Sequence, residues 1–239
     1  MRTHELHREG GPLAPDERPD VEPGTIVVYS DLSCAFAHLC VYRLHAARAR
    51  LGADVRFVHR HFVLEEVNRF PIPKHFLDSE VPAIAPLDPD AGWRVYTGLP
   101  ERWPVSTVLA MEAVRAAEEQ SPEAHEQLDR ALRMAFFRDH ECITMRHVIL
   151  DIAGRCDAVD ADRLADAIDD GRFRGPLIED HRAALRFVDG SPQLFLPDGS
   201  TFHNPGVAVD WTAPQGDGYP VVRWTDPDIH ESVIRRSAR

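Results

Sequence analysis

One stretch decides the fold of this chain: Ile26-Val27-Val28-Tyr29-Ser30-Asp31-Leu32-Ser33-Cys34-Ala35-Phe36-Ala37-His38. The β-branched run at its start predicts a buried strand, and a helical pattern begins after a short turn. Cys34 then stands on the first helical turn, where free N–H groups and the helix dipole favour negative charge. Because a thiolate is the reactive form of cysteine, Cys34 is a candidate nucleophile or redox group. A small buried residue at a helix start is the alternative interpretation.

The position of Cys34 predicts a thiol pKa below the ~8.5 of a free cysteine. His38, one helical turn further on, and the hydroxyl of Ser191 are candidate proton donors to the thiolate. Asp31 acts in the opposite direction, because a nearby carboxylate disfavours a second negative charge. We expect the helix end to outweigh Asp31, since Asp31 precedes the turn and Cys34 sits on the helix itself. For His38, packing in the core is the alternative to a role at the site.

Two motifs together resemble the DsbA-like branch of the thioredoxin superfamily. The turn Asp31–Ala37, after an apolar strand, resembles the active-site turn of that family. The stretch Val188–Leu196, which contains Ser191 and Pro192, resembles its cis-proline loop leading into the next strand. A long helical segment lies between them, where the family inserts a helical domain. The resemblance covers residues 25 to 205 approximately and implies an α/β, thioredoxin-like fold with a helical insertion domain.

This layout divides the chain into three parts. Residues 1–23 are polar and rich in Pro, Gly, Glu and Arg, so we expect a flexible tail. Residues 24–64 and 188–239 are expected to form a discontinuous thioredoxin-like domain. Residues 65–187 are expected to hold a lid loop and the helical insertion. The lid loop, 65–104, is rich in proline and weak in periodicity, and we expect part of it to border the cleft above Cys34.

Hydrophobic periodicity and turn signals predict the remaining elements. Strands are expected at 55–62, 193–196 and 201–203. No regular structure is expected in 204–224, which is rich in Pro and Gly. Helices are expected at 34–51, 106–120, 121–138, 144–154, 160–170, 173–187 and 228–236.

Ala37 occupies the position at which oxidoreductases of this family carry the second cysteine of Cys-x-x-Cys. Cys40 is a poor substitute, because six residues of helix separate the two Cα atoms by roughly 9 Å along the axis. The resemblance therefore implies chemistry through Cys34 alone, as in kappa-class glutathione transferases and 2-hydroxychromene-2-carboxylate isomerases. Cys40, Cys142 and Cys156 are interpreted as packing or surface thiols.

Three functions stay open. The layout favours a thiol-dependent oxidoreductase in which Cys34 forms a mixed disulfide with a disulfide substrate, resolved by a low-molecular-weight thiol as cosubstrate. The second is a thiol-dependent cis–trans isomerase or transferase acting on an electrophilic substrate. The third is a non-catalytic binding protein that has lost the second cysteine. No tightly bound cofactor is expected, and the resemblance implies substrate contacts from Ser33, Phe36, Ala37, His38, Ser191 and Pro192.

Charge and composition limit the partners. The formal net charge of −12 argues against nucleic acid and against an anionic membrane surface. No apolar run approaches the ~20 residues of a membrane helix, and no apolar segment opens the chain, so we expect a cytoplasmic protein. His59 and His61 share one face of a strand but lack a further ligand, so no metal site is predicted. A homodimer through an exposed edge strand or through 211–224 is one option.

Overall fold

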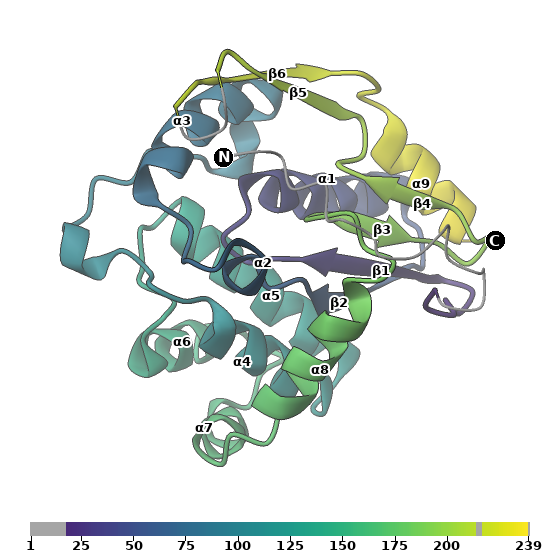
Figure 1. Cartoon of the computed structure of the whole chain (residues 1–239). Coiled ribbons are helices and arrows are strands. Elements are labelled where there is room, and N and C mark those ends of the chain that lie inside the picture. Colours follow the sequence, from purple (N-terminus) through teal and green to yellow (C-terminus); the bar gives the residue numbers. More distant parts are fainter. Residues whose placement is uncertain (1–17, 214–216, 239) are drawn as a thin grey trace.

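The computed structural model describes residues 18–213 and 217–238. Its central sheet has the strand order β2-β1-β3-β4 (Figure 1). β1 pairs in parallel with β2 and antiparallel with β3, and β3 pairs antiparallel with β4. These strands are β1 (Thr25–Ser30), β2 (Arg56–His61), β3 (Gln193–Phe195) and β4 (Thr201–His203).

A second, two-stranded sheet and a set of helices complete the described residues. The second sheet consists of β5 (Val207–Trp211) and β6 (Pro220–Trp224). Short 3-10 helices span Ala85–Leu87, Pro89–Ala91 and Pro100–Arg102. The α-helices are α1 (Ala35–Leu51), α2 (Leu64–Asn68), α3 (Lys74–Ile84), α4 (Val108–Glu118), α5 (Pro122–Phe137), α6 (Arg146–Ala153), α7 (Ala161–Asp169), α8 (Arg174–Ala184) and α9 (Ile229–Ser237).

β1 is the centre of the packing because both of its faces are covered. Its side chains alternate, so that Ile26 and Val28 contact α1 and α9, while Val27 and Tyr29 face the other side of the sheet. α1 and α9 pack on each other above the sheet in Figure 1, and α4, α5 and α8 lie below it against β2. All six residues of β1 are buried, as expected for a strand with helices on both faces.

The order β1-α1-β2, then helices, then β3-β4-α9 confirms the predicted thioredoxin-like α/β fold. α2 to α8 are inserted between β2 and β3, and their apolar faces build the largest hydrophobic cluster. α5 begins as the sequence predicts, since the Ser121 hydroxyl caps it by accepting from the Ala124 N–H. None of the helices in 18–213 and 217–238 is both long enough and apolar enough to cross a membrane.

The prediction that 65–104 lacks regular structure is wrong for 74–84, which form α3. Phe76, Leu77, Val81 and Ile84 make one apolar face of this helix. Pro82 obscured the helix in the sequence, because a proline inside a helix removes one backbone hydrogen bond. It is tolerated near the end of the helix, where the buried face holds the segment in place.

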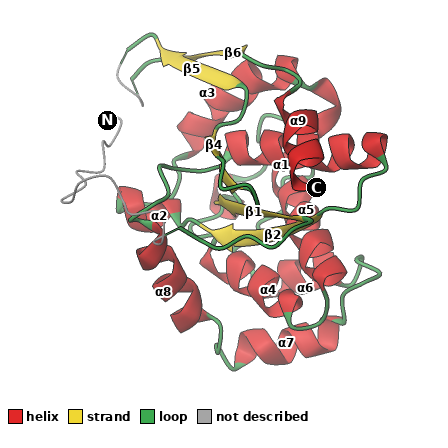
Figure 2. Cartoon of the chain, turned by 90° about the vertical axis from the view of Figure 1, so that its right-hand side faces the viewer, coloured by secondary structure: helices red, strands yellow, loops and turns green. Residues whose placement is uncertain are grey.

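The prediction that 204–224 is irregular is also wrong. β5 and β6 pair antiparallel, with Val207 opposite Trp224, and they lie beside α3 (Figure 2). Val207, Val222 and Trp224 pack against the large hydrophobic cluster. Pro220 is the first residue of β6, a position that needs no ladder N–H.

The predicted flexible tail, 1–23, falls partly outside the described residues, which begin at Arg18. Within the described part, Val21 is buried in a cluster with Tyr29 and Phe195. The chain therefore already packs on the sheet shortly before β1 begins.

Candidate active site

The turn after β1 meets the loop before β3 because of the register of this antiparallel pair. Tyr29 lies opposite Gln193, so continuing the pairing places Asp31 opposite Ser191. The Asp31 N–H donates to Ser191 Oγ at 2.9 Å across 160 residues of sequence. The Ser191–Pro192 peptide bond is cis.

Cys34 is the N-cap of α1 and faces the same loop. Its Sγ donates to the backbone oxygen of Ser191 at a separation of 3.2 Å. The residue is 6% exposed. The sheet register and the start of α1 thus bring Cys34, Ser191 and Pro192 together, although Cys34 precedes the first helical residue instead of being one.

The predicted low pKa of Cys34 is wrong: the pKa of this thiol is raised to about 11. Burial is the main cause, because a thiolate loses its hydration inside the protein, and the carboxylates of Glu80 and Asp31 add to the shift. The sequence shows that Asp31 lies close to the helix end, but it shows neither the burial of the thiol nor the charge of Glu80, which lies on a helix that was not predicted.

Asp31 organises the turn around Cys34. Its Oδ1 accepts from the Ser33 N–H at 2.8 Å, from Ser33 Oγ at 2.8 Å and from Thr107 Oγ1 at 3.2 Å. Its Oδ2 accepts from the Leu64 N–H at 2.9 Å. Asp31 therefore ties the turn to the first residue of α2 and to the start of α4. In the sequence, Asp31 is recognisable only as a charge that opposes the thiolate.

Arg133 of α5 also holds this turn through hydrogen bonds. It is 1% exposed, and its guanidinium donates to the Asp31 backbone oxygen at 3.0 Å and to Ser30 Oγ at 2.7 Å. The same side chain binds the Asp129 carboxylate at 2.7 and 3.1 Å. The i,i+4 spacing of Asp129 and Arg133 was visible in the sequence, but it is equally common for pairs on a helix surface.

The other predicted contact residues have different environments. The Ser33 hydroxyl bonds Asp31, so it holds the turn. Ala37 is completely buried. Phe36 is partly buried and lines a small cavity with Cys40 and Val207.

His38 is not bonded to Cys34 through its ring. Its Nε2 lies 2.8 Å from the backbone oxygen of Ala91, and the ring stacks on Phe137 with centroids 4.6 Å apart. Burial lowers the pKa of His38 to about 4, so the ring is neutral at neutral pH. These contacts hold Ala91 and the end of α5 against α1, so His38 has the packing role that was the alternative to a role at the site.

The cysteines and histidines of the described residues form no further centre. Cys34, Cys40, Cys142 and Cys156 are all free and buried. Within 18–213 and 217–238, no three or more His, Cys, Asp or Glu side chains are grouped so as to hold a metal ion.

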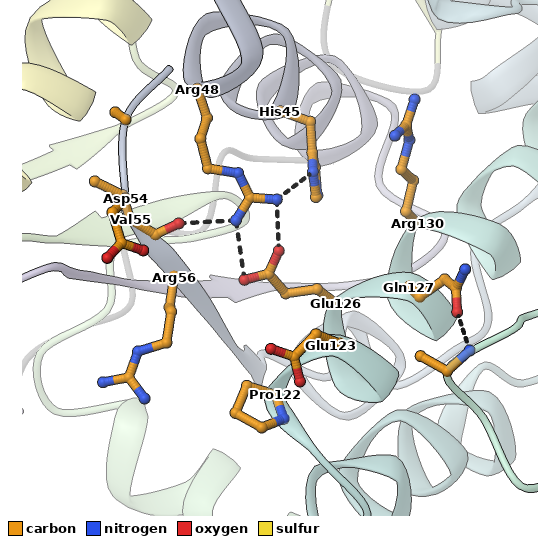
Figure 3. A pocket seen from close by; sticks show the side chains of 12 residues that line it. His45, Arg48, Asp54, Val55, Arg56, Pro122, Glu123, Glu126, Gln127 and Arg130 are labelled. Carbon is orange, nitrogen blue, oxygen red and sulfur yellow. Dashed lines mark hydrogen bonds and ion pairs between the residues drawn. The ribbon is translucent and has the colours of Figure 1, made fainter. Parts of the chain in front are cut away.

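A cavity of about 490 Å³ lies at the opposite end of α1 from Cys34 (Figure 3). His45 and Arg48 line it from the last turns of α1, and Glu126 and Arg130 line it from α5. Arg48 bonds the Glu126 carboxylate and the Val55 backbone oxygen (Figure 3). None of the predicted site residues reaches this cavity.

The fold and the site define a thioredoxin-like protein in which one helix-capping cysteine faces a cis-proline loop without a partner three residues later. The family model described as the DSBA-like thioredoxin domain matches residues 25–210. The chain belongs to this family. No curated protein matches it.

Solved structures share its fold at low sequence identity. The cytosolic disulfide reductase DsbM from Pseudomonas aeruginosa is 17% identical, with a TM-score of 0.59 over 74% of this chain and 87% of that one. A probable DsbA oxidoreductase from Streptomyces coelicolor is 15% identical, with a TM-score of 0.60 over 89% of each chain. A 2-hydroxychromene-2-carboxylate isomerase is 13% identical, with a TM-score of 0.57 over 74% of this chain and 87% of that one. Family and neighbours support an enzyme of the oxidoreductase or isomerase kind.

Proposed function

We propose that the protein is a thiol-dependent oxidoreductase in which Cys34 is the single nucleophile and a low-molecular-weight thiol is the cosubstrate. The observation that carries this proposal is the Cys34 Sγ, 3.2 Å from the Ser191 backbone oxygen, beside Pro192 and with Ala37 in the second position. Such a site supports attack on a disulfide but offers no neighbouring thiol to release the product.

The proposed cycle has two exchanges. The Cys34 thiolate attacks one sulfur of a disulfide R–S–S–R′, which forms Cys34–S–S–R and releases R′S⁻. A small-thiol thiolate then attacks the R sulfur, forms a second mixed disulfide with R, and releases the Cys34 thiolate. The protein gains or loses no net electron, because one small thiol is oxidised to the mixed disulfide with R while R′ leaves as a thiolate; a second small thiol is needed to release R as a thiol.

The cis-proline loop supplies the contact for the substrate. In the free protein the Ser191 backbone oxygen accepts a hydrogen bond from the Cys34 thiol. When that proton is lost, the oxygen has lost its donor, and an N–H of an extended substrate can take the place. The Pro192 backbone oxygen is already bonded to the Asn204 N–H at 3.1 Å, so Ser191 is the member of the loop that recognises substrate.

Two other functions have an observation in their favour. The single cysteine and the likeness to a 2-hydroxychromene-2-carboxylate isomerase support a thiol-dependent isomerase or transferase. The raised pKa of Cys34 supports a binding protein without chemistry, because most of the thiol stays protonated at neutral pH. We place the protein in the cytosol, which is supported by its four free cysteines and by the compartment of the neighbour DsbM.

The test combines mass and activity. Protein purified without reductant is analysed by intact mass for a small-thiol adduct, and reduction of a small-molecule disulfide is then measured with a thiol in excess. We expect an adduct on Cys34 and loss of activity in Cys34→Ser. Cys40→Ser is the matched control on the same helix and should keep the activity. An active Cys34→Ser, or faster alkylation at Cys142 or Cys156 than at Cys34, would overturn the proposal.

A further inference from the structure

The second sheet leaves one edge of β5 without hydrogen-bond partners. The Thr212 N–H, just after β5, donates to the Tyr219 backbone oxygen, and the ladder bonds of an antiparallel pair recur at every second residue. Asp210 is therefore the next β5 residue bonded to β6, while the N–H groups of Val209 and Trp211 point away from β6. No acceptor for these two groups lies within 18–213 and 217–238.

The other sheet edges within those ranges are closed, short or interrupted. On β2, the Phe57 N–H donates to Glu126 at 2.7 Å and the His59 N–H donates to His125 at 2.8 Å. β4 has only three residues. β6 lies on α3 and begins with Pro220, which has no N–H to offer. β5 has five residues without proline or lysine, which natural edge strands commonly use against pairing with another chain.

The sequence of β5, Val207-Ala208-Val209-Asp210-Trp211, fits a second copy of itself. In an antiparallel pair with a twofold axis at Val209, the N–H of each Val209 bonds the backbone oxygen of the other. Trp211 then lies opposite the partner's Val207 and donates its N–H to the backbone oxygen of that residue. The side chains at 207, 209 and 211 share one face of the strand, so the contact on that face is wholly apolar.

The charges on the opposite face of the strand are complementary as well. Asp210 and Arg223 form an exposed ion pair across the hairpin, and Arg223 lies opposite Ala208 in the ladder. In the twofold pair, Asp210 lies opposite the partner's Ala208, and the partner's Arg223 follows on the next strand. Alanine is short enough for the arginine side chain to extend over it, so an acid meets a base on each side of the axis. This match matters because a net charge of −12 otherwise makes two copies repel each other.

We propose that two copies of the protein associate through antiparallel pairing of their β5 strands, which joins both hairpins into one sheet of order β6-β5-β5-β6. The hairpin lies at the periphery of the molecule, at the top of both Figure 1 and Figure 2. The pairing makes no use of Cys34, so this inference is independent of the proposed function.

The experiment measures molar mass by sedimentation velocity over a concentration series, for the full chain and for two charge reversals, Asp210→Arg and Arg223→Asp. We expect the wild type to reach twice the mass of one chain. In either variant like charges meet on both sides of the axis, so we expect the dissociation constant to rise about tenfold or more. A mixture of the two variants restores the dimer, because each offers the charges that the other lacks. Asp169→Arg, at an exposed ion pair on α7, is the control and leaves the dimer intact.

The mixture separates this interface from a general effect of charge or folding. A wild type that stays monomeric at every concentration overturns the proposal. So does a wild-type dimer whose two variants stay dimeric, or whose variants stay monomeric when mixed. Val209→Pro removes the outward N–H without removing a ladder bond to β6, so it abolishes the dimer if the edge is the contact. Circular dichroism shows whether this variant is folded, and the exposed charge reversals keep the test valid if it is not.

Discussion

Asp31 carries the structure of the active-site turn, because one carboxylate accepts from four donors on three segments. In Asp31→Asn, an amide NH2 would replace one acceptor, and it would face either the Leu64 N–H or the donors around Oδ1. A buried donor without an acceptor costs ~1–3 kcal/mol, so we expect the free energy of unfolding to fall by about that amount. Urea denaturation measures it.

The control for this prediction is Asp198→Asn. Asp198 accepts from the Ser200 N–H and hydroxyl as Asp31 does from Ser33, but it is exposed at a turn. Water can replace those bonds, so we expect a loss below about 1 kcal/mol. The removed charge should also make Cys34 alkylate faster in Asp31→Asn, because Asp31 raises the thiol pKa. Equal stability losses in both variants would contradict the role of Asp31.

Ala37 is the residue that separates this chain from a dithiol oxidoreductase. It lies three residues after Cys34 at the start of α1, and side chains at that spacing are neighbours, within reach of a disulfide. In Ala37→Cys we expect oxidation to close a disulfide between 34 and 37 and to remove any small-thiol adduct. Thiol counting and intact mass after mild oxidation measure this. Ala47→Cys is the control on the same helix, and an adduct that persists in Ala37→Cys would show that 37 cannot reach the cysteine.

Local sequence patterns identify the residues around Cys34 but not the pKa of its thiol. Cys34, Ser191 and Pro192 could be identified because a turn, a helix start and a proline loop are local patterns. The pKa of Cys34 could not, because it depends on how much water the folded chain removes from the thiol and on Glu80, 46 positions further along the sequence. The sequence of the turn therefore predicts which residues form the site, whereas the charges around Cys34 depend on helices inserted between β2 and β3.

Among the helices, α5 carries a buried ion pair whose arginine also bonds the end of β1. Arg133 and Asp129 are 1% and 0% exposed in their side chains, and Arg133 also bonds the turn at the end of β1. Removing one partner leaves an uncompensated buried charge. We therefore expect Arg133→Leu to lower the free energy of unfolding by ~3–5 kcal/mol in urea denaturation.

The comparison for this prediction is a pair of similar geometry at the surface. Arg146 and Asp169 are bonded at 2.6 Å but are 44% and 56% exposed. Arg146→Leu should change stability by less than about 1 kcal/mol, because water screens the pair. A double variant, Arg133→Leu with Asp129→Leu, should be less destabilised than Arg133→Leu alone. If Arg133→Leu and Arg146→Leu lowered the free energy of unfolding equally, burial of the pair would not explain the effect of Arg133→Leu.

Helices and strands were predicted correctly where their own capping residues and apolar spacing suffice. They were missed where the structure depends on pairing or packing with a segment distant in sequence. α5 and α7 were recognisable from Ser121, Asp160 and their apolar faces. β5 and β6 were not, because each becomes a strand only by pairing with the other and packing on α3. α3 was not predicted, because prolines in this segment argue against a helix. Its apolar face is stabilising only when it packs on α1.

At the scale of the whole molecule, buried neutral histidines make stability depend on pH. Burial lowers the pKa of His38 to about 4 and the pKa values of His45, His61 and His230 to about 3. In the unfolded chain the same groups titrate near 6.5. Between these values the unfolded state binds more protons than the folded state, so acid favours unfolding.

We therefore expect stability to be complete above about pH 6.5 and to be lost as the pH falls from there towards about 4. Each of these histidines contributes about 1.4 kcal/mol of destabilisation at about pH 5.5 and about 1.4 kcal/mol more for each further unit, down to its folded pKa. Glu80 opposes this trend, because its raised pKa means that the folded state takes up a proton below about pH 7. Because one carboxyl group opposes four histidines, the free energy of unfolding still falls as the pH falls. Urea midpoints measured from about pH 7.5 to about 4.5 test this prediction.

His61 isolates the cause of this dependence. Both of its ring nitrogens are buried without a hydrogen-bond partner in the described residues, so a phenylalanine loses no bond there. In His61→Phe the slope of unfolding free energy against pH should decrease by about 1.4 kcal/mol per unit below about pH 6.5, because one titrating group has been removed. His147→Gln, at an exposed position, should leave the slope as it is. If His61→Phe kept the wild-type slope, the acid sensitivity would come from carboxylates such as Asp129. Burial alone would raise the pKa of Asp129, but Arg133 and His59 beside it lower this pKa, so its contribution is lost only in stronger acid.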